Sequence, residues 1–160
     1  MRTRVVVWVV AVALVGLHFL LHVGLGIGRA APDLLTVALL LCVREVGLGT
    51  AAGIGLAFGL LEDALNVVAF GANTVAMTLL GVAGGATRDL FVGDSLFFLI
   101  SYFVLGKFAR VLVHWIVVGE ALREPFYSQV LMGGLLGGLY AAAVGIVVMA
   151  VTGLWRESPR

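Results

Sequence analysis

Charged residues are scarce in this chain of 160 amino acids, at 12% of the total, whereas hydrophobic residues make up 62%. A soluble domain has about 25% charged and about 45–50% apolar residues. The shortage of charge therefore excludes an ordinary soluble domain and predicts an integral membrane protein in contact with the lipid bilayer. The formal net charge is +1 and no basic run occurs, which argues against binding of nucleic acid.

Cysteine and proline are also rare, with one cysteine and three prolines. Cys42 cannot form an intrachain disulfide and lies in an apolar run, so we interpret it as a small core hydrophobe. The sequence contains no low-complexity tract that would separate two domains. We therefore expect residues 1–160 to form a single transmembrane domain.

The first apolar run, Val5–Ile27, follows two arginines and superficially resembles a secretory signal. It is longer than the about 7–15 apolar residues of a signal. The small residues Ala30 and Ala31 would be the only cleavage site, and Arg29 interrupts it. We therefore expect this run to be retained as the first membrane span.

The apolar runs predict an all-α integral membrane protein, a bundle of six transmembrane helices. The second run has only ten residues, which is too short for a full crossing at a rise of about 1.5 Å per residue. We expect it to form a short or partly re-entrant helix that the other helices shield. The expected spans are residues 5–27, 34–43, 46–62, 74–86, 95–118 and 126–154.

The arginines outside the expected spans are unevenly distributed between the two sides. Six of them fall on the side of the termini and two on the other side. Because basic residues favour the cytoplasmic side, we expect both termini to be cytoplasmic. The first group is Arg2, Arg4, Arg44, Arg88, Arg156 and Arg160, and the second is Arg29 and Arg123.

Glycines four residues apart recur in three of the apolar runs. In lipid, small residues at this spacing let two helix backbones approach closely. Six short helices must first pack on one another, so we expect these glycines to serve internal packing more than docking of a partner. The residues are Gly49, Gly53, Gly55, Gly59, Gly81, Gly85, Gly133 and Gly137.

Ionisable residues within the apolar runs are the candidate functional groups. Glu62 and Asp63 end the third run, and Lys107, Arg110 and His114 lie on one face of the fifth, at i, i+3 and i+7. A rise of about 1.5 Å per residue places the acids and bases at similar depth in the outer half of the membrane.

An unpaired Lys, Arg or Asp at the membrane centre costs about 2.5–3.5 kcal/mol. We therefore expect an intramembrane polar network in which Glu62 or Asp63 pairs with Lys107 and Arg110. Two alternatives remain open. The two basic side chains extend separately to the interface, or the charges form a transport or proton-relay site.

Other candidate chemistry is limited. His18 and His22 have the i, i+4 spacing of two metal ligands on one helix, but no third ligand is evident, so we expect no metal and no cofactor. The sequence contains no nucleophile elbow, P-loop or HExxH motif. We therefore expect no catalytic residue and no enzyme activity.

Several short motifs resemble the family of the rod shape-determining protein MreD. Pro32 and Asp33 precede the second helix, an acidic residue at Asp63 ends the glycine-rich third helix, and Gly71-Ala-Asn73 precedes a run that ends in Gly81-Val-Ala-Gly84. The resemblance covers about residues 31–110. The sequence departs from the family pattern at Glu62, and neither Lys107 nor Arg110 belongs to that pattern.

The resemblance implies a non-catalytic scaffold subunit of the bacterial cell-elongation (rod) complex in the inner (cytoplasmic) membrane. Such a subunit binds the bitopic membrane protein MreC. Through the complex, it helps couple MreB filaments to a RodA-type glycosyltransferase and a class B penicillin-binding transpeptidase. These enzymes build the peptidoglycan of the cell wall and maintain cell shape.

The resemblance also implies a fold similar to the six-helix substrate-binding component of energy-coupling-factor transporters. The alternative function is therefore a small-molecule-binding membrane subunit of a vitamin-type transporter, with the buried charges lining its pocket.

Overall fold

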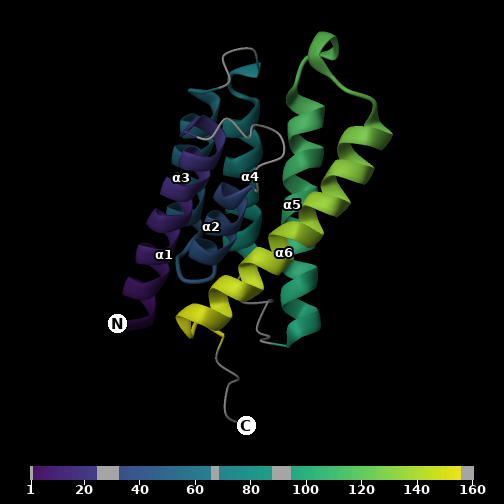
Figure 1. The fold of residues 1–160 in the computed structure, drawn as a ribbon. Coiled ribbons are helices and arrows are strands. Elements are labelled where there is room, and N and C mark those ends of the chain that lie inside the picture. The colour runs from purple at the N-terminus through teal and green to yellow at the C-terminus, as the bar shows by residue number, and fades with distance from the viewer. Residues whose placement is uncertain (1, 25–32, 66–68, 88–94, 156–160) are drawn as a thin grey trace.

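The computed structural model describes residues 2–24, 33–65, 69–87 and 95–155. These residues form helices and contain no strand, which confirms the expected all-α class. The helices run alternately up and down the bundle, so that the start of the first and the end of the last lie at the same end (Figure 1). The elements are α1 (Arg2–Phe19), η1 (Leu20–Gly24), α2 (Leu34–Val43), α3 (Leu48–Asp63), α4 (Ala72–Thr87), α5 (Leu96–Val117), η4 (Glu120–Leu122), η5 (Tyr127–Met132) and α6 (Gly133–Thr152).

The helix bounds lie close to the ranges expected from the apolar runs. Helix α2 covers residues 34–43, and α3, α4, α5 and the combined η5–α6 segment differ from their expected ranges by at most two residues at each end. The first helix begins earlier, at Arg2, and continues through the π-helical turn η1 to Gly24. Residues 25–27 of the first expected span lie outside the described part of the chain.

Helix α2 is the core of the bundle, because all ten of its residues are buried. It contacts α1, α3, α4, α5 and α6, which explains why it is apolar on every face. Both of its ends find hydrogen-bonding partners. Asp33 caps the N-terminus, and near the C-terminus the Tyr102 hydroxyl donates to the Leu40 carbonyl oxygen at 2.8 Å. The short helix is therefore shielded within the bundle.

Helix α1 contacts this core through a narrow stripe and leaves its other faces open. The buried residues Val7, Ala11, Leu14 and His18 recur at the helical spacing of three and four. Val9 and Val12, on the outer side, are 63% and 70% exposed. A helix with this distribution suits a position between a protein core and lipid.

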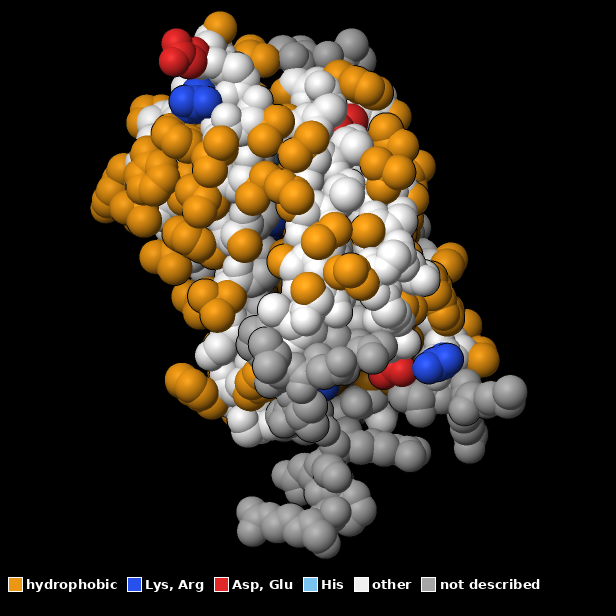
Figure 2. All heavy atoms as spheres, turned by 180° about the vertical axis from the view of Figure 1, so that it is seen from behind, with side chains coloured by type: hydrophobic (Ala, Val, Ile, Leu, Met, Phe, Trp, Pro, Cys, Tyr) orange, Lys and Arg blue, Asp and Glu red, His pale blue; other side chains and the backbone are white. Residues whose placement is uncertain are grey.

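Three helices are long and apolar enough to cross a membrane, namely Arg4–Val23, Leu96–Val117 and Tyr127–Thr152. The outer wall of the bundle has the matching character. Hydrophobic side chains cover much of the face seen from behind, and most of the charged side chains visible there lie near its two ends (Figure 2). The exposed hydrophobics include Phe97 and Val151, each 81% exposed. Both features are those of a protein that lies in a membrane.

Helices α3 and α4 pack closely because glycines remove side chains at their contact. A Cβ atom added at Gly59 would lie 2.7 Å from the Asn73 carbonyl oxygen and 2.8 Å from the Thr74 backbone nitrogen. Gly55 faces the backbone of Met77 in the same way. From the other side, Gly81 and Gly85 of α4 face the backbones of Ala51 and Leu48, respectively. These four expected glycines lie at a helix contact.

The expectation was wrong for three other glycines. A Cβ atom at Gly49 or Gly53 would meet nothing within 4 Å, and one at Gly133 would meet only the Ser128 carbonyl oxygen, at 3.5 Å. In α3, the contact with α4 uses only the second of two glycine pairs. The pairs are offset by six residues, which is not a whole number of helical turns, so they point to different sides.

Helix α6 shows a similar offset of its contact face. Gly137 lies against the Lys107 side chain, but the closer approach to α5 occurs at Gly134 and Gly138, one residue later than the expected pair. The sequence has glycine at 133 and 134 and again at 137 and 138, so either pair of positions could have formed the close contact with another helix.

We expect Gly59→Ala to destabilise the protein, by about 1–3 kcal/mol, because the methyl group overlaps the backbone of α4. Thermal unfolding of the detergent-solubilised protein measures this change. Gly53→Ala is the matched control, since it adds the same methyl group to the same helix in open space. Equal melting temperatures of the two variants would contradict the proposed close contact.

Candidate functional site: a charge cluster inside the bundle

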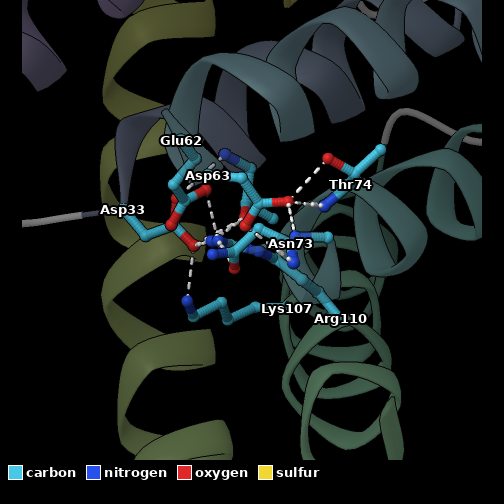
Figure 3. Close-up of polar contacts among 9 residues, drawn as sticks. Asp33, Glu62, Asp63, Asn73, Thr74, Lys107 and Arg110 are labelled. Atoms are coloured by element: carbon cyan, nitrogen blue, oxygen red, sulfur yellow. Dashed lines mark hydrogen bonds and ion pairs between the residues drawn. The ribbon is translucent and has the colours of Figure 1, made fainter. Parts of the chain in front are cut away.

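The guanidinium of Arg110 lies at the centre of the candidate site. Arg110 belongs to α5 and is only 5% exposed. It donates hydrogen bonds to the carboxylate of Asp33, to the Thr36 hydroxyl at 2.9 Å, to Glu62 Oε2 at 2.5 Å and to Asn73 Oδ1 at 3.1 Å. Figure 3 shows Asp33, Glu62 and Asn73 converging on Arg110 from different parts of the bundle.

This arrangement explains how a positive charge is tolerated inside an apolar bundle. A guanidinium presents five donors in a planar fork and stays protonated, so it needs several acceptors at fixed directions. The carboxylates of Asp33 and Glu62 supply the compensating charge, and the Thr36 hydroxyl and the Asn73 amide oxygen accept further hydrogen bonds from the guanidinium. Because the acceptors come from the N-terminus of α2, the end of α3 and the start of α4, Arg110 connects α5 to all three.

Lys107 lies one turn before Arg110 and pairs with the same carboxylate. Its Nζ atom is 2.5 Å from Asp33 Oδ2. Asp33 also caps α2, because Oδ1 accepts from the Thr36 backbone N–H at 3.1 Å and Oδ2 from the Thr36 hydroxyl at 2.6 Å. Asp33 therefore holds the N-terminus of the central helix against two cations of α5.

The expected pairing was only partly right. Arg110 contacts Glu62, whereas Lys107 contacts Asp33, which the charge argument had left out. The two cations turn inward to carboxylates, so separate extension to the membrane interface does not describe the structure. Helix periodicity placed the bases on one face of α5, but it could not show that the chain before α2 returns to that face.

Asp63 has a different role from the expected ion pair. It is fully buried and accepts hydrogen bonds from the backbone N–H groups of Gly71, Asn73 and Thr74, at 2.9, 3.2 and 2.8 Å, and from the Thr74 hydroxyl at 2.6 Å. Among the described residues it forms no ion pair with Lys107 or Arg110. Successive residues of a helix point about 100° apart. Glu62 therefore faces α5 while Asp63 faces the turn into α4.

The turn between α3 and α4 depends on a glycine. Gly71 has a φ of +95°, in the region that residues with a Cβ atom rarely adopt. This conformation accompanies the hydrogen bond from its N–H to Asp63. The family-like positions Asp63, Gly71 and Asn73 thus form one capped turn that also presents Asn73 to Arg110. Pro32, the remaining motif residue before Asp33, lies outside the described residues.

A polar cavity of about 440 Å³ adjoins the cluster. His114, one turn after Arg110, lines it and makes no hydrogen bond within the described part of the chain. The cavity also extends to the two π-helical turns, η1 and η5. Its lining residues are His18, His22, Asp33, Glu62, Asn73, Lys107, Arg110, Val111, His114, Glu124, Ser128, Gln129 and Gly133.

The histidines of α1 and η1 stack on each other rather than forming an evident metal centre. The ring centroids of His18 and His22 are 4.1 Å apart, and Nδ1 of His22 lies 3.1 Å from the His18 carbonyl oxygen. Within the described ranges, no group of three or more His, Cys, Asp or Glu side chains is arranged to hold a metal ion.

Two members of the cluster, Thr36 and Asn73, were not expected as partners of the buried charges. Asn73 belongs to the family-like motif, but nothing in its spacing connects it to α5. Thr36 is the only polar residue of α2, which is a usable signal, because a hydroxyl in a wholly apolar helix needs a partner when it is buried.

We expect Arg110→Met to reduce stability by about 3–5 kcal/mol, because it leaves the carboxylates of Asp33 and Glu62 buried without their shared cation. Lys107→Met should have a smaller effect, since Arg110 still neutralises Asp33. The yield of monodisperse protein in detergent and its thermal unfolding measure both effects. Arg123→Met, outside the cluster, is the control. A loss for Arg110→Met no larger than the control loss would contradict the central role of Arg110.

We expect Asp63→Ala to lower the free energy of unfolding by about 2 kcal/mol, the upper end of the range for a lost helix cap, because four donors lose their acceptor. Ser95→Ala is the matched control. Ser95 caps α5 through a single bond to the Phe98 N–H at 3.3 Å and is exposed, so its loss should be under about 1 kcal/mol. If Asp63 acts instead mainly as a charge, Asp63→Asn should be as harmful as Asp63→Ala. A cap predicts partial rescue by the amide oxygen.

Comparison with known proteins leaves the family open. No protein-family model matches the chain, and neither curated proteins nor solved structures include a match. The resemblance to the MreD family therefore stays a prediction from the quoted motifs, and the membrane character of the chain is argued from its three long apolar helices.

Proposed function

We propose that this chain is a non-catalytic scaffold subunit of a bacterial cell-elongation complex, comparable to MreD. In this proposal all six helical segments form one bundle in the cytoplasmic membrane, with both termini in the cytoplasm and a fold similar to the substrate-binding component of energy-coupling-factor transporters. The partner that it contacts directly is an MreC-type bitopic protein. MreB, a RodA-type glycosyltransferase and a class B transpeptidase are reached through the complex.

The observation that carries the proposal is the internal pairing of the intramembrane charges. Asp33, Glu62, Lys107 and Arg110 contact one another and join α2, α3 and α5. Their purpose on this view is to hold a compact bundle together, and the outer wall is left to hydrophobic side chains (Figure 2). A rigid apolar wall suits lateral contact with the membrane helix of a partner, because such contacts rest on packing in lipid.

The arrangement of the helix ends supports the proposed topology. The beginning of α1 and the end of α6 lie at one end of the bundle (Figure 1). The uneven distribution of arginines favours the cytoplasm for that end. Helix α2, about 15 Å long by its rise, does not need to meet lipid on either side, because its neighbours enclose it.

The polar cavity favours a second candidate function, a small-molecule-binding subunit of a vitamin-type transporter. Its volume of about 440 Å³ lies within the range of about 300–1,000 Å³ that is typical of ligand pockets. It adjoins the charge cluster at the end of the bundle opposite the N-terminus of α1. We rank this function second because the charges nearest to the cavity already neutralise one another.

Co-purification tests the scaffold proposal. The chain is expressed alone or together with an affinity-tagged MreC-type protein from the same genome. The membranes are then extracted in mild detergent. We expect the chain to be retained with the tagged partner and to show a higher melting temperature in its presence. The control is an unrelated tagged bitopic protein of similar membrane-span length.

The opposite result would favour the transporter subunit. A chain that is stable alone, does not bind the MreC-type protein and retains a vitamin-sized molecule after purification would contradict the scaffold proposal. Native mass spectrometry of the purified chain detects such a molecule directly.

A further inference from the structure

The charge cluster leaves hydrogen-bonding capacity of both signs facing the cavity. Among the described residues, the Lys107 ammonium donates a hydrogen bond to Asp33 alone, so it uses one of its three donors. Glu62 binds Arg110 through Oε2, and its other oxygen accepts no hydrogen bond in the described part of the chain. Both residues line the cavity, and their side chains are 13% and 23% exposed, respectively. A molecule in the cavity could therefore accept hydrogen bonds from the Lys107 ammonium and donate one to the second carboxylate oxygen of Glu62.

The balance of charge limits what the cavity can hold. Two carboxylates, Asp33 and Glu62, oppose two cations, Lys107 and Arg110, so the cluster is neutral as a unit. A simple anion or cation would bring an uncompensated charge into a region between apolar helices, which is costly. A group that carries one charge of each sign would leave the balance unchanged and could use both free sites.

The surroundings of the cavity also indicate a binding site. Two segments of π-helix border it, η1 through His22 and η5 through Ser128 and Gln129. Interruptions of this kind occur frequently at functional sites. Gln129 Oε1 is buried without a hydrogen-bond partner in the described chain, so a polar group is missing from its surroundings.

The cavity lies between helix ends that diverge. Helix α6 crosses α5 obliquely and begins on the opposite side of α5 from α1 in the view of Figure 1. The cavity is nevertheless lined by residues from α1 and η1 on one side and from η5 on the other. A molecule held by lipid in that half of the membrane, or one that arrives from the adjacent water, would meet the same polar groups.

We propose that this cavity binds a zwitterionic group, with a primary ammonium on Glu62 and an anionic phosphate or carboxylate on Lys107. Gln129 contributes an acceptor for a further donor of the ligand. Two sources share this chemistry, namely the headgroup of a phosphatidylethanolamine lipid and a small free zwitterion such as glycerophosphoethanolamine, whose phosphodiester carries a single negative charge. The inference goes beyond the scaffold role and does not depend on it, because a scaffold can hold a structural lipid.

Binding to the purified chain in a detergent without charge tests the inference. The probes are short-chain dihexanoyl phosphatidylethanolamine, the matching phosphatidylcholine and phosphatidylglycerol, and free glycerophosphoethanolamine, each titrated by thermal shift. We expect phosphatidylethanolamine to bind about tenfold or more tightly than phosphatidylcholine, whose quaternary ammonium has no N–H to donate to Glu62. Phosphatidylglycerol, which has no ammonium, should bind as weakly as phosphatidylcholine.

Free glycerophosphoethanolamine distinguishes the two sources, because it has the charges of the lipid headgroup without the acyl chains. If it binds as tightly as the lipid, the ligand comes from water, which supports the transporter subunit. If only the lipid binds, the site is a headgroup site, which is compatible with the scaffold. Both results support the zwitterionic chemistry. Equal binding of all three lipids, or no binding of phosphatidylethanolamine and glycerophosphoethanolamine, would overturn it and leave a cavity filled by water.

Two variants connect the binding to the cavity. Glu62→Gln should reduce phosphatidylethanolamine binding about tenfold while leaving phosphatidylcholine binding unchanged. Because that variant also removes a partner of Arg110 and can reduce folding, Gly133→Leu provides an independent test. Gly133 lines the cavity, and a Cβ atom added there would meet only the Ser128 carbonyl oxygen, at 3.5 Å, so leucine occupies ligand space and leaves every residue of the ion pairs in the sequence.

Gly16→Leu is the matched control for Gly133→Leu. Gly16 lies on α1, where an added Cβ atom meets nothing within 4 Å, and it does not line the cavity. We expect the Gly133 variant to lose phosphatidylethanolamine binding and the Gly16 variant to keep it. Retention of full binding by a folded Gly133→Leu protein would place the ligand elsewhere. Co-purification with the MreC-type protein is measured in parallel, so that failure of either proposal is recognised separately.

Discussion

A buried guanidinium needs anionic partners, and this requirement organises the structure. Arg110 is 5% exposed and lies among apolar helices, where an isolated charge is strongly unfavourable. Its acceptors come from three separate places in the chain, namely Asp33 and Thr36 at the start of α2, Glu62 near the end of α3 and Asn73 at the start of α4. The bundle must bring these places together before the charge is compensated. One side chain therefore determines how α2, α3 and α4 meet α5 at the end of the bundle where the cavity lies.

Polar capping and close glycine packing support that arrangement from the α3–α4 side. Asp63 accepts four hydrogen bonds at the start of α4, and this holds the turn that presents Asn73 to Arg110. Gly55 and Gly59 allow the two helices to approach until their backbones nearly touch. The two neighbouring acids thus have different roles. Glu62 compensates the charge of Arg110, whereas Asp63 fixes the backbone of the turn between α3 and α4. In lipid, where apolar contact alone does not favour one helix pair over another, such specific contacts select the arrangement.

The polar cavity distinguishes the bundle from a purely structural one. A cluster that existed only to join helices would be closed on itself, whereas Lys107 and Glu62 both keep unused capacity on the side of the cavity. The same residues can therefore stabilise the bundle and recognise a polar molecule. A scaffold and a binding component differ here in what occupies the cavity rather than in how the helices are arranged.

The sequence by itself determined the membrane character, the position of the helices and the presence of buried charge. Each of these follows from local features, such as the length of an apolar run or the spacing of Lys107, Arg110 and His114 on one helix. It did not determine which acid pairs with which base, because Asp33 and Lys107 are 74 residues apart and only the return of α2 into the centre of the bundle joins them. Nor could it select among consecutive glycines in α3 and α6, since either phase of the repeat makes a suitable face. The tertiary structure decided both the ion pairing and the choice of glycines, because both depend on how each helix is rotated about its own axis. Apolar surroundings do not fix that rotation. It becomes fixed only when residues from distant segments of the chain come into contact.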